Sequence, residues 1–186
     1  MTSAGVLRSI ALALESVGIP FMLTGSFAAA YHGVPRATMD IDLVIDPSEA
    51  QLRALILAVE ASGQYASIDA ALGALRHETL FNVIDPDSGW KIDLIIRKSR
   101  AFSRLEFDRR SRINFDGVTL AVATVEDVVL SKLEWAKLGG SARQLEDVAG
   151  LLKVHAGELD REYLRQWVEG LGVGAQWEAA LRLAEL

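Results

Sequence analysis

The sequence contains no cysteine, which excludes disulfides and thiolate metal sites. It has no apolar run long enough to span a membrane, and no basic region followed by an apolar signal segment, so the cytoplasm is the expected location. Its three histidines share no metal-ligand spacing. The motifs HExxH, the phosphate-loop lysine, GxGxxG and the serine nucleophile elbow are also missing. The chemistry must therefore come from other residues.

Positive charge is scarce as well. The 186 residues include 19 lysines and arginines against 25 aspartates and glutamates, a formal net charge of -6. Any binding of nucleic acid must therefore use a local patch rather than the whole surface. Apolar residues make up 51% and charged residues 24%, which is typical of a globular protein. The length suits one domain, or one domain with a helical appendage.

Apolar spacing predicts an α/β (α+β) protein with a mixed sheet. Helices are expected at residues 3–17, 26–31, 49–62, 124–138, 142–155, 161–168 and 174–186. Strands are expected at residues 21–23, 40–46, 79–84, 90–96 and 113–123. The turn-rich residues 85–89 predict a hairpin between the two strands that flank them, and Asp116-Gly117 indicates either a hairpin or a bend within the last strand. Residues 64–76 are expected to form a loop and a short helix. The change of pattern at residues 121–124 predicts a core over 1–123 and a helical region packed on it over 124–186.

Two carboxylates stand out in the first half of the chain. Asp40 and Asp42 flank Ile41 on a predicted strand, so both side chains point to the same face. Neighbouring carboxylates repel each other, and in proteins a shared divalent cation usually offsets this repulsion. Asp93 lies among apolar residues in the later strand KIDLII, where an unpaired carboxylate is costly. It is either a strand-end residue facing solvent or a third ligand.

Two further patterns each have a structural and a functional interpretation. Gly25-Ser26 joins a strand to a helix, either as a simple tight turn or as a phosphate-binding turn. Arg143 and Asp147 lie four residues apart on a predicted helix, where they could form a salt bridge or contribute to a site. Neither pattern decides between its alternatives alone.

A basic stretch follows the strand that carries Asp93. It could hold a polyphosphate or an RNA backbone, or it could be a solvated helix face. Its cations are Arg97, Lys98, Arg100, Arg104, Arg109, Arg110 and Arg112.

Taken together, a Gly-Ser turn, paired carboxylates and a third carboxylate are the parts that nucleotidyl transfer needs. The segments GSFAAAYHGVPRATMDID and KIDLII resemble the DNA polymerase β nucleotidyltransferase superfamily. Its pattern is Gly followed by Gly or Ser, two aspartates around one apolar residue, and a later strand aspartate. The segments VEDVVLSKLEWAK and RQLEDVAGLL resemble, more narrowly, its bacterial AbiE/MenT-like branch, which includes toxins.

The resemblance implies roles for individual residues. Asp40, Asp42 and Asp93 would be catalytic and would bind the metal, Mg²⁺ or Mn²⁺. The remaining site residues would bind the nucleotide, and these are Gly25, Ser26, Arg36, Lys132 and Asp147.

The expected activity is transfer of a nucleoside monophosphate from an NTP to a hydroxyl acceptor. An RNA 3′ end, reached through the basic stretch, is the first candidate acceptor. A toxin with a cognate antitoxin is one biological setting. The alternatives are a non-catalytic nucleotide- or protein-binding relative, antitoxin-like or regulatory, and an antibiotic-modifying nucleotidyltransferase. An antibiotic-modifying enzyme should have an open acidic groove beside Asp42.

Overall fold

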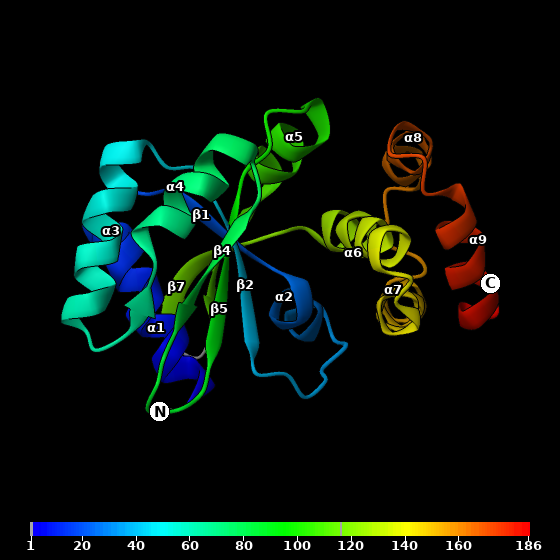
Figure 1. Ribbon diagram of the computed structural model, residues 1–186. Helices are drawn as coiled ribbons and strands as arrows, with labels where there is room; N and C mark the ends of the chain where they lie inside the picture. The colour runs from blue at the N-terminus through cyan, green and yellow to red at the C-terminus, as the bar shows by residue number, and fades with distance from the viewer. Residues whose placement is uncertain (1, 116) are drawn as a thin grey trace.

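The computed structural model describes residues 2–115 and 117–186, which form nine helices and one seven-stranded sheet (Figure 1). The helices are α1 (Ser3–Ser16), α2 (Gly25–Tyr31), α3 (Glu49–Ala61), α4 (Ile68–His77), α5 (Ala101–Arg109), α6 (Val125–Gly139), α7 (Ala142–Val154), α8 (Arg161–Gly170) and α9 (Gly174–Ala184). The strands are β1 (Phe21–Thr24), β2 (Asp40–Ile45), β3 (Tyr65–Ala66), β4 (Leu80–Ile84), β5 (Lys91–Ile96), β6 (Ser111–Phe115) and β7 (Val118–Val122). The predicted mixed fold is confirmed.

The strands lie in the order β3-β4-β5-β2-β1-β7-β6. β2 pairs in parallel with β5, and β1 pairs in parallel with β7, whereas the other neighbours are antiparallel. Both predicted hairpins, β4-β5 and β6-β7, are therefore present. Asp116, in the predicted turn of the second hairpin, lies outside the described residues.

The sheet separates two layers of helices. In Figure 1, α1, α3 and α4 lie on one side of the sheet, and α2, α6 and α7 lie on the other, with α8 and α9 farther out. On β2, Ile41, Leu43 and Ile45 are fully buried, while Asp40 and Asp42 alternate with them and so point to the opposite face. The carboxylates thus face the layer that contains α2 and α6.

A buried carboxylate joins α6 to α5 and α8. Asp127 accepts hydrogen bonds from the hydroxyl of Thr124 (2.7 Å), Nε of Arg109 (3.2 Å) and the hydroxyl of Tyr163 (2.6 Å). Thr124 is the N-cap of α6, and it accepts from the backbone N–H of Asp127. This network ties the C-terminal helices to the helix that carries Lys132. The division at residues 123 and 124 stays a prediction.

Among the described residues, no helix has the length and apolar character that crossing a membrane requires.

Candidate active site

Strand register brings the carboxylates of two strands together. Asp42 on β2 is directly opposite Asp93 on β5 in a parallel pair. Residues opposite each other on neighbouring strands project from the same face of the sheet. Asp40 lies two residues before Asp42 and shares that face. The three predicted carboxylates therefore line one face, although their segments are far apart in the sequence.

Gly25 presses its backbone against Asp42. Its φ is +63°, and a Cβ added there would lie 2.0 Å from Oδ2 of Asp42. The next backbone N–H, that of Ser26, donates to the Asp42 carboxylate. The Gly-Ser turn is therefore more than a link between β1 and α2, because a side chain at position 25 would displace the carboxylate.

The pKa of Asp42 is raised from 3.8 to about 6. Burial is the largest cause, and the charges of Asp93 and Asp40 add to it, while Lys132 and the Ser26 N–H oppose it. Burial, and after it the repulsion from the neighbouring carboxylates, thus disfavours the charged form of Asp42. Asp40 lies at the rim of the site, with 52% of its side chain exposed.

Lys91 lies between the other two carboxylates. Its Nζ is 3.3 Å from Oδ1 of Asp40 and 3.2 Å from Oδ2 of Asp93. Asn82, opposite Asp93 on β4, donates to Oδ1 of Asp93 at 2.6 Å. Neither Lys91 nor Asn82 was predicted from the sequence. The sequence could have indicated Lys91 by its position, because it lies two residues before Asp93 on the same strand face.

The donor set suits a hard divalent cation. In residues 2–115 and 117–186, no three carboxylate or imidazole side chains form a ready-made metal cage. Mg²⁺ does not require such a cage, since it is usually held by one or two carboxylates together with substrate phosphates. The ammonium group between Asp40 and Asp93 marks a position where a positive charge is stabilised.

Two cationic side chains face the carboxylates across the cavity, Lys132 from α6 and Arg36 from the loop between α2 and β2. Nζ of Lys132, on α6, donates to Oδ2 of Asp147 at 2.7 Å and to Oε1 of Gln144 at 3.1 Å. Nε of Arg36 donates to the same Asp147 oxygen at 3.1 Å, and its Nη2 donates to the hydroxyl of Ser26. Lys132 is only 2% exposed, and burial lowers its pKa. These contacts hold the side chains of Lys132 and Arg36 on the side of the cavity opposite the carboxylates.

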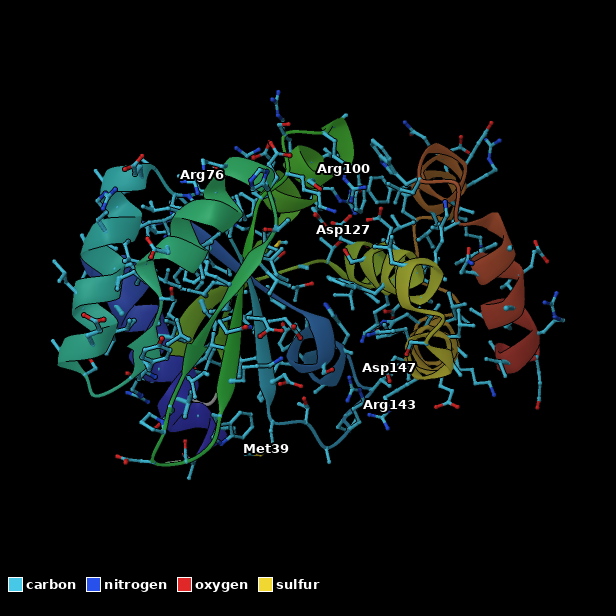
Figure 2. The ribbon with its side chains drawn as sticks, viewed as in Figure 1. Met39, Arg76, Arg100, Asp127, Arg143 and Asp147 are labelled. Atoms are coloured by element: carbon cyan, nitrogen blue, oxygen red, sulfur yellow. The ribbon has the colours of Figure 1, made fainter. Side chains whose placement is uncertain are left out.

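The salt bridge considered between Arg143 and Asp147 is not formed. Asp147 pairs instead with Arg36 and Lys132, and Figure 2 shows it on the side of α7 that faces α2. Arg143 is exposed. Asp147 is therefore a site residue that orients two cations, rather than half of a surface pair.

One cavity of about 220 Å³ joins the two sets of charges. It is lined by every predicted site residue except Asp147, which lies behind Arg36 and Lys132. Lining residues that the sequence did not single out include Thr38, Ser131, Trp135 and Gln144. Ser131 and Trp135 flank Lys132 on α6, so only the position of Lys132 could have indicated them.

The basic stretch is largely engaged inside the protein. Arg97 pairs with Asp46, Arg100 with Glu134, and Arg109 with Asp127. Arg110 donates to the backbone carbonyl of Phe107. Within the described part of the chain, four cations of the stretch form no salt bridge, and these are Lys98, Arg104, Arg110 and Arg112. Fewer cations of the stretch are therefore available to bind an RNA than the sequence indicated.

Comparison with solved structures shows the same fold in nucleotidyltransferases. The antibiotic-resistance factor ANT(2'')-Ia is similar at a TM-score of 0.58 and 15% identity, over 96% of this chain and 94% of that one. A lincosamide antibiotic adenylyltransferase with bound lincomycin gives 0.53 and 13%, over 83% and 98%. An antigenic nucleotidyltransferase-like protein from Paracoccidioides brasiliensis gives 0.52 and 19%, over 96% and 91%. The protein therefore has a nucleotidyltransferase fold.

The family is shown by the sequence itself. Residues 6–184 match the family described as nucleotidyl transferase AbiEii toxin, type IV toxin–antitoxin system, and the chain belongs to that family. Membership implies an NTP substrate and a cognate antitoxin. The predicted AbiE branch and nucleotidyltransferase class are thus confirmed. No match was found among curated proteins.

Proposed function

We propose that the protein transfers a nucleoside monophosphate from an NTP to the 3′ hydroxyl of an RNA. The observation that carries this proposal is the pairing of Asp42 with Asp93 on neighbouring strands, opposite Arg36 and Lys132 in one cavity. Carboxylates on one wall suit a divalent cation, and cations on the other suit phosphates. An NTP bound with its metal presents both kinds of charge.

Asp40, Asp42 and Asp93 would hold the metal, Mg²⁺ or Mn²⁺. When bound, such an ion neutralises charge that develops on the phosphates during transfer. Arg36 and Lys132 would hold the phosphates, and Asp147 keeps both cations in place. Gly25 and Ser26 complete the phosphate side, where the Ser26 hydroxyl accepts from Arg36 and its backbone N–H fixes Asp42.

The transfer step joins the acceptor oxygen to the α-phosphorus. As this bond forms, the bond from the α-phosphorus to the bridging oxygen breaks, and pyrophosphate leaves. The proton of the hydroxyl passes to the carboxylate of Asp93, which Asn82 and Lys91 orient from either side. Its side chain is 15% exposed, so an acceptor can reach it from the cavity.

Replacing Gly25 by alanine is expected to lower the transfer rate by about 100-fold. The new methyl group would push Asp42 out of place, and a displacement of about 1 Å in a reacting site can cost a factor of this size. Steady-state assays with labelled NTP measure the effect.

Gly63→Ala is the matched control. Gly63 also has a positive φ, +81°, but a Cβ added there meets nothing within 4 Å. Both variants should lose about 1–2 kcal/mol of stability from backbone strain, yet the control should keep its activity. Equal activity in the two variants would contradict a role for the close approach to Asp42.

The proposed function is tested by incubating the protein with each α-labelled NTP and total cellular RNA, followed by gel and mass analysis. We expect one NTP to label RNA at its 3′ end and Asp93→Asn to abolish the label. Label on protein or on small molecules alone would overturn the RNA acceptor. Absence of transfer from every NTP, with either divalent cation, would overturn the proposed activity.

An antibiotic-modifying function is not favoured by the cavity. Such an enzyme is expected to have an open acidic groove beside Asp42 for a cationic acceptor, whereas Arg36 and Lys132 line the same cavity as the carboxylates.

A further inference from the structure

A second cavity opens beside the first. It has a volume of about 210 Å³ and lies between the sheet, α5 and α6. The two cavities share the lining residues Thr24, Leu80, Ile95, Ser131 and Trp135. A ligand could therefore extend from one into the other without leaving the protein surface.

The floor of the second cavity continues the sheet face that carries the carboxylates. On β5, Ile95 follows Asp93 at the next position on the same face, about 7 Å farther along the strand. On β2, Val44 follows Asp42 in the same way and lines the second cavity. A group resting on this floor lies within the length of one nucleoside from Asp93.

The wall of the cavity suits a flat, partly apolar ring. Trp135 is 47% exposed and lines both cavities, and Leu138, one turn farther along α6, is 73% exposed. Large apolar side chains on a surface mark binding sites when they gather around a cavity. Indole rings stack on any nucleic-acid base, since every base has a π face.

The charges of the second cavity are nearly all satisfied within the protein. Arg97 pairs with Asp46 at 2.8 Å, and Nη1 of Arg100 is 2.6 Å from Oε1 of Glu134. Glu106 is buried and accepts from the hydroxyl of Ser131, and burial, with the nearby Asp127, raises its pKa to about 8. Because these charges are already paired or buried, they leave no excess positive charge to bind a triphosphate and no excess negative charge to bind a strongly cationic ligand.

One cation of the second cavity has no salt bridge to a described residue, although the carboxylate of Glu78, which lines the same cavity, interacts with it electrostatically. Lys98 lines the cavity and forms no salt bridge within residues 2–115 and 117–186. It can therefore pair with one external phosphate. A site for one phosphate beside an aromatic side chain suits a single nucleotide of a nucleic-acid strand.

We propose that the second cavity binds the 3′-terminal nucleotide of the acceptor RNA, with its base against Trp135 and its phosphate beside Lys98. The ribose then reaches across the shared boundary, so that its 3′ hydroxyl meets Asp93. This assignment rests on the proposed function, since it names the place of the acceptor in that reaction.

The test measures binding of fluorescently labelled hexauridylate and hexaadenylate in the absence of NTP, by fluorescence anisotropy. Trp135→Ala should raise the Kd at least about 10-fold, and Trp135→Phe should restore most of the affinity because it keeps a stacking surface. Tyr65→Ala is the control, because Tyr65 is also exposed (60%) but lies on the edge strand β3. Binding of a fluorescent ATP analogue should weaken much less than RNA binding in Trp135→Ala, and should change less than twofold in Tyr65→Ala.

Two further measurements locate the end of the RNA and its phosphate. A hexanucleotide with a 3′-phosphate should bind more weakly, because the added charge would lie beside the carboxylates. Lys98→Ala should reduce the slope of log Kd against log salt by about 0.7, as expected for one phosphate contact on a single strand.

Each outcome bears on the inference separately from the activity. If the protein transfers label to RNA but Trp135→Ala binds both hexanucleotides like the unchanged protein, the assigned cavity is wrong and the activity stands. If Trp135→Ala weakens the ATP analogue as much as the RNA, the cavity belongs to the nucleotide and the inference fails. If RNA binding depends on Trp135 but no label is transferred, the cavity stands and the proposed function fails.

Discussion

Asp42→Asn is expected to lower nucleotidyl transfer by about 1000-fold while making the metal-free protein more stable at pH 7. The loss of activity follows from removing a charged ligand at the centre of the carboxylate cluster. The gain in stability follows from the pKa of Asp42, which folding raises from 3.8 to about 6. This difference corresponds to about 3 kcal/mol by which the ionised carboxylate opposes folding. Urea unfolding and a labelled-NTP assay measure the two effects.

The same residue gives a defined dependence on pH. Between pH 4 and 6 the folded protein holds the Asp42 proton more tightly than the unfolded chain does. The free energy of unfolding contributed by this residue is therefore present below pH 4 and is lost as pH rises through 6. Asp42→Asn should not show this decline. Asp87→Asn, at an exposed turn, should follow the unchanged protein.

Excess Mg²⁺ at pH 7 should recover part of the lost stability in the unchanged protein, because a bound cation offsets the carboxylate repulsion. It should do so much less in Asp42→Asn. A stability profile without a decline between pH 4 and 6, relative to Asp42→Asn, would contradict the raised pKa of Asp42, which burial and the neighbouring carboxylates cause.

Asp147→Ala is expected to destabilise the protein by about 3–5 kcal/mol and to abolish transfer. Removing one partner of a buried ion pair leaves an uncompensated charge, here on Lys132, which is 2% exposed. Arg36 loses its carboxylate partner at the same time. Thermal and urea unfolding measure the stability, and Glu146→Ala, at the exposed neighbouring position, is the control.

A double variant separates the two consequences of this change. Lys132→Met in the Asp147→Ala background removes the unpaired charge, so it should recover part of the stability without recovering activity. If the double variant is no more stable than Asp147→Ala, the buried charge is not the cause of the loss.

Local patterns predicted the elements well, because apolar spacing reflects the face that each element buries. β3 was missed because two residues are too few to show an alternation. Asp40 and Asp42 were placed together by the two-residue period of a strand. The alignment of Asp42 with Asp93 depends on pairing between β2 and β5, which lie far apart in the chain, and only the family resemblance indicated it.

The sequence did not predict which side chains pair when they come from elements that are far apart in the chain. Asp147 has Arg143 at the correct helical spacing, but α7 turns the carboxylate toward Lys132 and Arg36 instead. A buried partner outweighs a solvent-exposed one, because exposed pairs contribute little. The basic stretch shows the same limit, since the acidic partners of its arginines come from other elements. Lys132 was identified through the family resemblance alone, whereas the helical spacing of Asp147 had left a site role open beside the salt bridge.

The order of the site residues along the chain has a consequence for biosynthesis. Translation completes the carboxylates with β5, whereas Asp147, which orients Arg36 and Lys132, arrives only with α7. A nascent chain that still holds α7 within the ribosome therefore carries the aspartates without the ordered cations. We expect the growing chain to be inactive until α7 has emerged, which would protect a cell that makes a toxin from its unfinished copies.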